Sequence, residues 1–142
     1  MRALAHSDNG LDTLFSYQHG GNWRVLRSHD VSNYIATRAG DHFTAKEFRT
    51  WNATVLMALA LANAAPSRAA RSRERVIAAS IRQVAGWLGD TPAVARKSYI
   101  DPQLISRYES AGELPTIPAV PVALPAPAEA EIAVTALLAA AR

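Results

Sequence analysis

The sequence of 142 residues contains no cysteine. This absence excludes a disulfide framework, cysteine-ligated metal sites and thiol catalysis. The chain also has no apolar run near the roughly 20 residues that a transmembrane helix needs, and its N-terminus lacks the basic and then apolar pattern of a secretory signal. We therefore expect a cytoplasmic protein without a membrane partner.

Patterns that bind metals or nucleotides are missing as well. No metal-ligand spacing relates the four histidines, which are His6, His19, His29 and His42. The chain has no glycine-rich phosphate loop, so an ATP-driven mechanism has no basis in the sequence. We expect no metal, no other cofactor and no ATP.

Apolar residues are plentiful, at 49% of the chain, and can form the core of one ordinary domain. The 15 basic and 12 acidic side chains give a formal charge of +3, which permits an anionic partner without requiring one. Several arginines cluster in one stretch: Arg68, Arg71, Arg73, Arg75 and Arg82. We interpret this cluster as a phosphate-facing surface, with a solvated helix face as the alternative.

The first part of the chain is predicted to form a hairpin and a helix. Two β-favouring runs, residues 14–17 and 23–26, flank a polar connection with two glycines. Ser28 is a suitable N-cap for a helix over about residues 29–39, and Gly40 can end it. The side chains that this helix is expected to bury are Val31, Tyr34 and Ile35.

A second helix is predicted over about residues 45–62, because Thr44 and Glu47 have the spacing of a capping box ahead of an apolar run. Its expected core stripe consists of Phe48, Trp51, Val55 and Leu59. Arg49 lies about 100° around the helix from Phe48, on the side of Lys46, so it can edge a groove while packing holds its helix.

Further helices follow a break at Pro66. One runs to about Leu88, with the arginines largely on another face than its expected apolar residues, Ile77, Ile81, Val84 and Leu88. Gly89 ends it, and Thr91-Pro92 begins a short segment that delivers Tyr99. Asp101-Pro102 begins another helix, which Gly112 ends.

The composition then changes. Five prolines interrupt an Ala/Val-rich stretch: Pro115, Pro118, Pro121, Pro125 and Pro127. We expect a domain over residues 1–112 and a disordered tail over residues 113–142, with a possible short helix from Ala128. The fold class is therefore mainly α, with a small N-terminal β-hairpin and a disordered C-terminal tail.

Arg49 and Tyr99 are the residues that indicate chemistry. Cleavage of a phosphodiester by tyrosine needs a phenolic nucleophile, a guanidinium on the non-bridging oxygens and a further hydrogen-bond donor. Two of these three groups are present in a suitable order. By itself, however, a tyrosine more often serves packing or a surface hydrogen bond.

The whole pattern over residues 43–108 resembles the C-terminal catalytic region of the bacterial and poxvirus-like type IB DNA topoisomerases. Two long blocks carry the resemblance, Phe-Thr-Ala-Lys-Glu-Phe-Arg-Thr-Trp from residue 43 and Leu-Gly-Asp-Thr-Pro-Ala-Val-Ala-Arg-Lys-Ser-Tyr-Ile-Asp-Pro from residue 88. It covers roughly residues 11–112 and implies a helical catalytic core of the DNA breaking-rejoining type.

By this resemblance, Tyr99 is the nucleophile that forms a 3′-phosphotyrosyl link, and religation needs no ATP. Arg49 is similar to a catalytic arginine that binds the scissile phosphate; the alternative is a surface arginine paired with Glu47 or Asp90. Asp90 stands nine residues before Tyr99, where the family has a His or Asn donor. An ionised aspartate only accepts hydrogen bonds, so this position departs from the family.

The resemblance also implies double-stranded DNA as the partner and a cytoplasmic, nucleoid-associated location. The residues expected to contact DNA are Lys46, Arg71, Arg75, Arg96 and Lys97. In the family, a further arginine and a general-acid lysine lie upstream of the hairpin, and this sequence has no counterpart of either. It also has no counterpart of the domain that closes around DNA. We therefore expect a truncated catalytic domain that is weakly active or inactive.

Three alternatives remain at this stage. A tyrosine recombinase also uses an arginine and a later tyrosine, but it usually has His-x-x-Arg where this chain has Lys46 to Arg49. A non-catalytic DNA-binding module would use the arginine face alone. A helical domain without DNA affinity is the last alternative.

Overall fold

The computed structural model describes residue 13 and residues 15–40, 42–66 and 68–140. Parts of the expected hairpin, helix break and tail, at residues 14, 67 and 141–142, lie outside the described residues. The chain divides into two compact units, Met1–Ala45 and Lys46–Arg142. Each is described by itself.

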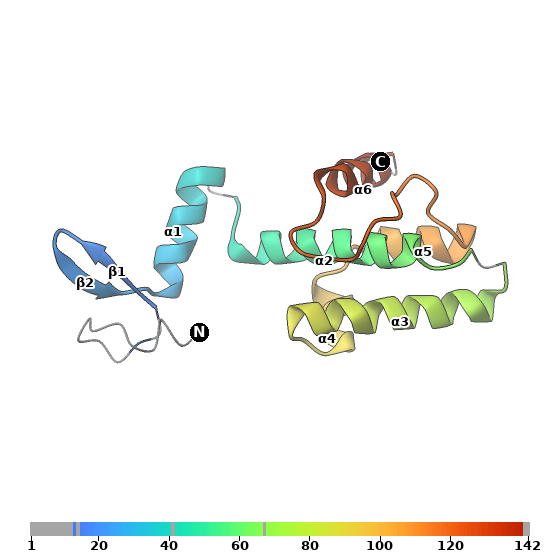
Figure 1. Cartoon of the computed structure of the whole chain (residues 1–142), viewed down its shortest axis with the longest axis horizontal. Coiled ribbons are helices and arrows are strands. Elements are labelled where there is room, and N and C mark those ends of the chain that lie inside the picture. Colours follow the sequence, from blue (N-terminus) through green and yellow to red (C-terminus); the bar gives the residue numbers. More distant parts are fainter. Residues whose placement is uncertain (1–12, 14, 41, 67, 141–142) are drawn as a thin grey trace. The chain divides into compact units, whose positions relative to one another are not determined.

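The N-terminal unit contains the predicted hairpin. Strand β1 (Ser16–His19) pairs antiparallel with β2 (Asn22–Val25), as Figure 1 shows. The two residues between the strands, Gly20 and Gly21, have φ of 58° and 81°. A two-residue hairpin turn needs positive φ at both positions, which glycine adopts without steric cost, so the turn follows directly from the sequence.

Helix α1 (Ser28–Ala39) follows the hairpin. It begins one residue earlier than predicted, and the Arg27 N–H donates to the Asp30 carboxylate at 2.8 Å. The predicted burial was wrong: none of its residues is buried, with Val31 at 38% and Tyr34 at 65% exposed. A two-stranded hairpin and one helix have too little apolar surface to cover this face within their own unit.

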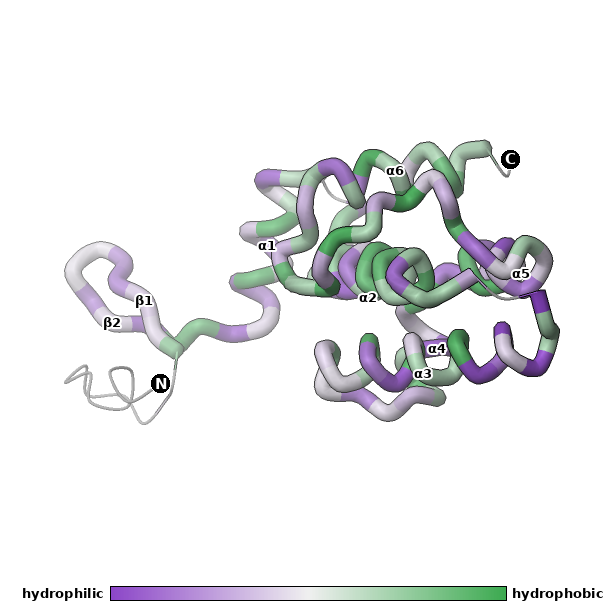
Figure 2. Tube along the Cα trace, turned by 45° about the vertical axis from the view of Figure 1, so that its right-hand side comes forward, coloured by the Kyte–Doolittle hydropathy of each residue, from purple (hydrophilic) through white to green (hydrophobic). Residues whose placement is uncertain are grey.

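The second unit is built around helix α2. Its helices are α2 (Ala45–Ala62), α3 (Ala70–Leu88), α4 (Pro92–Ser98), α5 (Pro102–Ala111) and α6 (Ala128–Ala139). Helix α2 runs between α3 and α6 (Figures 1 and 2), and every residue from Ala53 to Leu61 is buried. A helical segment that is apolar on nearly all sides belongs in the interior, and this part of α2 forms the centre of the unit.

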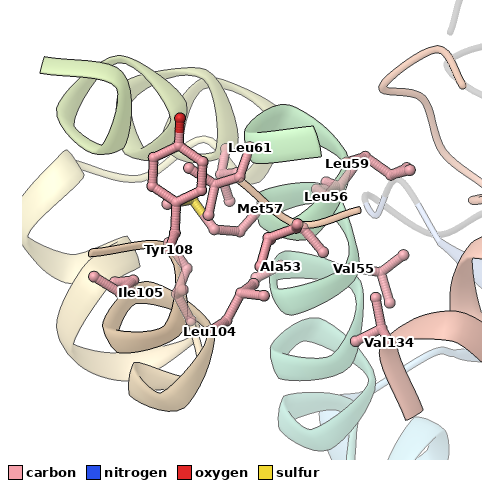
Figure 3. Packing of buried hydrophobic residues seen from close by; sticks show 14 of the residues in the cluster. Ala53, Val55, Leu56, Met57, Leu59, Leu61, Leu104, Ile105, Tyr108 and Val134 are labelled. Carbon is pink, nitrogen blue, oxygen red and sulfur yellow. The ribbon is translucent and has the colours of Figure 1, made fainter. Parts of the chain in front are cut away.

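Figure 3 shows how neighbouring helices cover α2. The side chains of Leu104 and Tyr108 on α5 lie beside Ala53 and Met57, and Val134 of α6 lies on the side of Val55. These contacts, together with the predicted boundaries of α2, confirm a mainly α fold with a small hairpin.

The predicted core stripe of α2 was only partly correct. Val55 and Leu59 are buried and Trp51 packs against the core, but Phe48 is 48% exposed. Phe48 lies more than a turn before Ala53, where the fully covered part of the helix begins. The spacing therefore identified the right face, but the neighbouring elements that pack on this face do not reach the first turns of the helix.

Helix α3 has the two faces that the sequence predicts. Ile77, Ile81 and Val84 are buried, and the fourth predicted residue, Leu88, is partly buried against the core. The arginines predicted for another face, Arg71, Arg75 and Arg82, are exposed. Figure 2 shows the resulting hydrophilic stretches along α3. The prediction of an apolar face and a separate basic face on this helix is confirmed.

The C-terminal segment differs from the disordered tail that the sequence predicts. Its possible helix is present as α6, and five of its side chains are buried: Leu114, Ile117, Ala130, Val134 and Leu137. The Asn63 amide also donates to the Val120 carbonyl oxygen at 2.8 Å. Prolines prevent a continuous helix here, but the apolar residues between them still pack on the core, which composition alone does not reveal.

Tyr108 gives a testable consequence of this core. Its side chain is 0% exposed, and its hydroxyl has no hydrogen-bond partner among the described residues. Burial raises the pKa of Tyr108, an effect that the positive charge of Arg73 opposes. Because the folded chain then holds this proton more tightly than the unfolded chain, folding stability should fall as the pH rises beyond about 10.

We expect Tyr108→Phe to leave stability at pH 7 unchanged or to raise it by about 1 kcal/mol, since the lost hydroxyl is buried without a partner. The variant should also lose part of the alkaline destabilisation. Urea unfolding at pH 7 and pH 10.5 measures both effects. A variant that is clearly less stable at pH 7 would mean that the hydroxyl has a partner in solution.

Candidate active site

Arg49 lies on the second turn of α2, just before the buried part of that helix. Its guanidinium Nη2 donates to the Asp90 carboxylate, with which it forms an ion pair, and to the Leu88 carbonyl oxygen at 2.5 Å. The side chains of Arg49 and Asp90 are 38% and 23% exposed, so the pair is partly open to solvent. Packing of α2 therefore holds Arg49 at an edge, as its position on the helix predicts.

Tyr99 completes the group. The central carbon of the Arg49 guanidinium lies 5.0 Å from the centre of the Tyr99 ring, a cation–π distance. The three residues proposed from the sequence as catalytic, Arg49, Asp90 and Tyr99, are thus brought together from α2, the α3–α4 connection and the end of α4. Their catalytic roles stay a prediction.

The charges around Arg49 favour its protonated form. The hydrogen bond to Asp90 raises the pKa of Arg49 most, partial burial opposes this, and the negative charge of Asp90 and the neighbouring Tyr99 raise it further. The buried Nε of Arg49 has no hydrogen-bond partner among the described residues. This buried donor of the guanidinium is therefore unsatisfied within the described part of the chain.

Local capping sets the path of the chain through Tyr99. The Thr91 side chain accepts from the Val94 N–H at 3.3 Å, and Pro92 begins α4. The Tyr99 N–H donates to the Ala95 carbonyl oxygen at 3.1 Å. The Asp101 carboxylate then caps α5 by accepting from the Gln103 N–H at 2.8 Å. These caps are the ones that the sequence predicts.

Thr54 is a residue that sequence reasoning missed. Its buried hydroxyl contacts the backbone on both sides of Ile100, at the Tyr99 carbonyl and the Asp101 N–H. A single threonine within the apolar run of α2 gives no signal of such a role. Only the fold places it beside the end of α4.

The predicted DNA-contacting residues fall into two places. Arg96 and Lys97 are exposed in the last turn of α4, next to Tyr99, and Lys46 is exposed in the first turn of α2. Arg71 and Arg75 lie near the start of α3, and Arg75 is 13 positions before Leu88, a distance of about 20 Å along the axis. The structure therefore does not bring Arg71 and Arg75 to the Arg49–Tyr99 group.

The arrangement favours a state in which Arg49 is already engaged. The pairing with Asp90, which the sequence offered as an alternative for this arginine, is observed. An external anion would have to compete with the Asp90 carboxylate for the guanidinium.

No group of three His, Cys, Asp or Glu side chains that could hold a metal ion occurs in the described part of the chain. None of the described helices is long and apolar enough to cross a membrane.

Comparison with known proteins relates the chain to DNA topoisomerases. Residues 1–113 match the family model of the eukaryotic DNA topoisomerase I catalytic core. The chain is also 31% identical over 107 residues to a DNA topoisomerase 1B of Acanthamoeba polyphaga mimivirus, an alignment that covers 70% of this chain and 32% of that protein. The chain thus spans about a third of the length of this curated relative.

Proposed function

This chain belongs to the family of the eukaryotic DNA topoisomerase I catalytic core, and on that premise we propose that it acts in the transient cleavage and religation of one strand of duplex DNA. The observation that carries the proposal is the Arg49 guanidinium, 5.0 Å from the centre of the Tyr99 ring. The phenol and the cation beside it are two of the three groups that tyrosine-mediated phosphodiester cleavage requires.

In the proposed reaction, the Tyr99 phenol oxygen attacks the scissile phosphorus. A phosphorus–oxygen bond forms to the tyrosine as the bond to the 5′-oxygen breaks; the phenol loses its proton and the departing 5′-oxygen gains one. The product is a 3′-phosphotyrosyl link and a free 5′-hydroxyl. Because the link is again a phosphodiester, the reverse step reseals the strand without ATP.

Arg49 would bind the non-bridging phosphate oxygens through its guanidinium fork. To do so it must exchange the Asp90 carboxylate for phosphate, while the Leu88 carbonyl oxygen continues to orient it. Asp90 opposes the phosphate in this proposal. An ionised Asp90 also supplies no hydrogen-bond donor to the phosphate, so we expect a slow reaction.

The test is covalent trapping on a nicked suicide duplex, from which the cleaved fragment diffuses away before religation. A denaturing gel should show a slow band that contains both the protein and the labelled strand. Duplex binding without any adduct would contradict the proposed cleavage. It would instead favour a non-catalytic DNA-binding function, for which the engagement of Arg49 by Asp90 is the supporting observation.

The same experiment separates the proposed topoisomerase from the recombinase alternative. The family match favours cleavage without strand exchange. Adducts should form on suicide duplexes of several unrelated sequences. Cleavage restricted to one sequence, with transfer of the strand to a second duplex, would favour the recombinase.

DNA binding by the exposed face of α3 gives a separate prediction. Each phosphate contact contributes about 0.9 to the slope of log K against log salt concentration. Log K falls as the salt concentration rises, and each lost phosphate contact should make this fall less steep. We therefore expect the slope to become shallower by about 0.9 in Arg75→Ala and by about 1.8 in the double variant Arg71→Ala, Arg75→Ala. Fluorescence anisotropy of a labelled duplex over a range of salt concentrations measures this.

The matched control is Arg107→Ala, which removes the same charge from α5. It should leave the slope unchanged. Equal slopes for the Arg75→Ala variant and the unmodified chain would show that the face of α3 is a solvated surface and not a DNA contact.

A further inference from the structure

Thr54 is a buried polar residue in the otherwise apolar centre of α2. It is 2% exposed, and its neighbours Ala53 and Val55 are fully buried. A hydroxyl can both donate and accept a hydrogen bond, and the Thr54 hydroxyl does both. The hydroxyl donates to the Tyr99 carbonyl oxygen at 3.3 Å and accepts from the Asp101 N–H at 3.2 Å.

These two bonds hold the chain where it leaves α4. Tyr99 is the C-cap of α4, and the α5 N-cap, Asp101, follows after one residue. The intervening Ile100 is 4% exposed, so this connection runs against the core. Backbone groups at such a place need hydrogen-bond partners, because a buried group without one destabilises the fold. The Thr54 hydroxyl satisfies one group on each side of Ile100.

Thr54 also connects the two candidate catalytic residues. It follows Arg49 by five residues on the same helix, a rise of about 7.5 Å. Arg49 reaches the Tyr99 ring, and Thr54 bonds the Tyr99 backbone. Since α2 is packed at the centre of the unit, it can fix the positions of both the Arg49 guanidinium and the Tyr99 backbone.

We propose that Thr54 is a positioning residue, which holds the Tyr99 backbone at a set distance from Arg49 through its hydroxyl. This role rests on the proposed function, because it matters for catalysis only if Tyr99 attacks DNA. Its physical basis is separate, namely the two hydrogen bonds across the α4–α5 connection. The methyl group of threonine adds to the effect, since branching at Cβ restricts the side-chain rotamer.

The first test compares Thr54→Val with Thr54→Ser. Valine has nearly the same shape but no hydroxyl, whereas serine keeps the hydroxyl. Displacement of reacting groups by about 1 Å can cost 10²-fold in rate, so we expect Thr54→Val to slow adduct formation about 10-fold or more at saturating suicide duplex. Duplex affinity should stay unchanged, and Thr54→Ser should restore most of the rate.

Equal adduct rates for the unmodified chain and Thr54→Val would overturn the proposal. So would a loss of rate in Thr54→Val that Thr54→Ser does not restore, because that outcome would assign the effect to packing and not to the hydroxyl.

The second test needs no DNA and no activity, and it separates failure of this proposal from failure of the proposed function. Nuclear magnetic resonance of the full chain follows the exchange of the Asp101 amide and the contacts between the Arg49 side chain and the Tyr99 ring. In Thr54→Val, the amide should lose protection and the contacts should weaken; in Thr54→Ser both should persist. A protected Asp101 amide and intact contacts in Thr54→Val would overturn the role of Thr54, even for a chain that forms no adduct.

If Thr54→Val does not fold, as judged by circular dichroism, Thr54→Ala takes its place. Alanine removes the hydroxyl without adding a methyl group to a crowded site. The expected and contradicting results are the same as for the valine variant.

Discussion

Replacing Tyr99 with phenylalanine is expected to abolish the covalent adduct between this protein and a suicide duplex. Tyr99→Phe removes only the oxygen that would bond to phosphorus and keeps the ring beside the Arg49 guanidinium. No neighbouring group replaces a lost nucleophile of this kind, so the residual signal should be undetectable. Duplex binding should persist, because the proposed phosphate contacts are made by basic side chains.

Two other tyrosines are the matched controls. Tyr108→Phe removes a buried hydroxyl, and Tyr34→Phe removes a hydroxyl from a side chain that is 65% exposed. Both variants should still form the adduct at the rate of the unmodified chain. An adduct that survives Tyr99→Phe would assign the nucleophile to another residue and would remove the basis for the proposed mechanism.

Replacing Asp90 with asparagine should have a large effect in the opposite direction. The change removes the charge that pairs with Arg49 and supplies an amide, which can donate a hydrogen bond. One donor to the reacting group is commonly worth about 10²–10³ in rate, so we expect adduct formation to accelerate by about 10²-fold. Single-turnover trapping over time measures the rate.

The fold should tolerate this change. The pair is partly exposed, and such an ion pair contributes only about 1 kcal/mol or less. The Leu88 carbonyl oxygen remains as an acceptor that orients Arg49. We therefore expect Asp90→Asn to fold normally and to bind duplex DNA more tightly.

Asp101→Asn is the matched control for Asp90→Asn. It changes the net charge equally, two residues from Tyr99, and asparagine also serves well as the N-cap of α5. The control should not accelerate the reaction. If both variants form the adduct faster by the same factor, the effect is a general one of more positive net charge. If neither variant forms it faster, Asp90 does not restrain Arg49.

The helix boundaries near the site could be predicted because they depend on residues close in sequence. Thr91 and Asp101 cap α4 and α5 through hydrogen bonds to amides two or three residues away. Gly89 and Gly112 end α3 and α5 with positive φ, which glycine adopts without a steric penalty. Each of these signals is complete within one turn of helix.

Burial was harder to predict because it depends on which other elements cover a face. The apolar spacing on α2 gave equal weight to Phe48 and Val55, yet only Val55 is covered. The same limit explains the exposure of Val31 on α1. It also explains the packed C-terminal segment, where composition indicated disorder although Ile117 lies in the core.

The sequence by itself determined the order of the helices, the basic and apolar faces of α3 and the residues of the candidate site. Only the tertiary structure decided that Arg49 pairs with Asp90, 41 residues away, and that Thr54 bonds the Tyr99 backbone, 45 residues away. The physical reason is the range of the interactions. Capping and periodicity act within a few residues, whereas these contacts exist only after packing brings α2, α3 and α4 together.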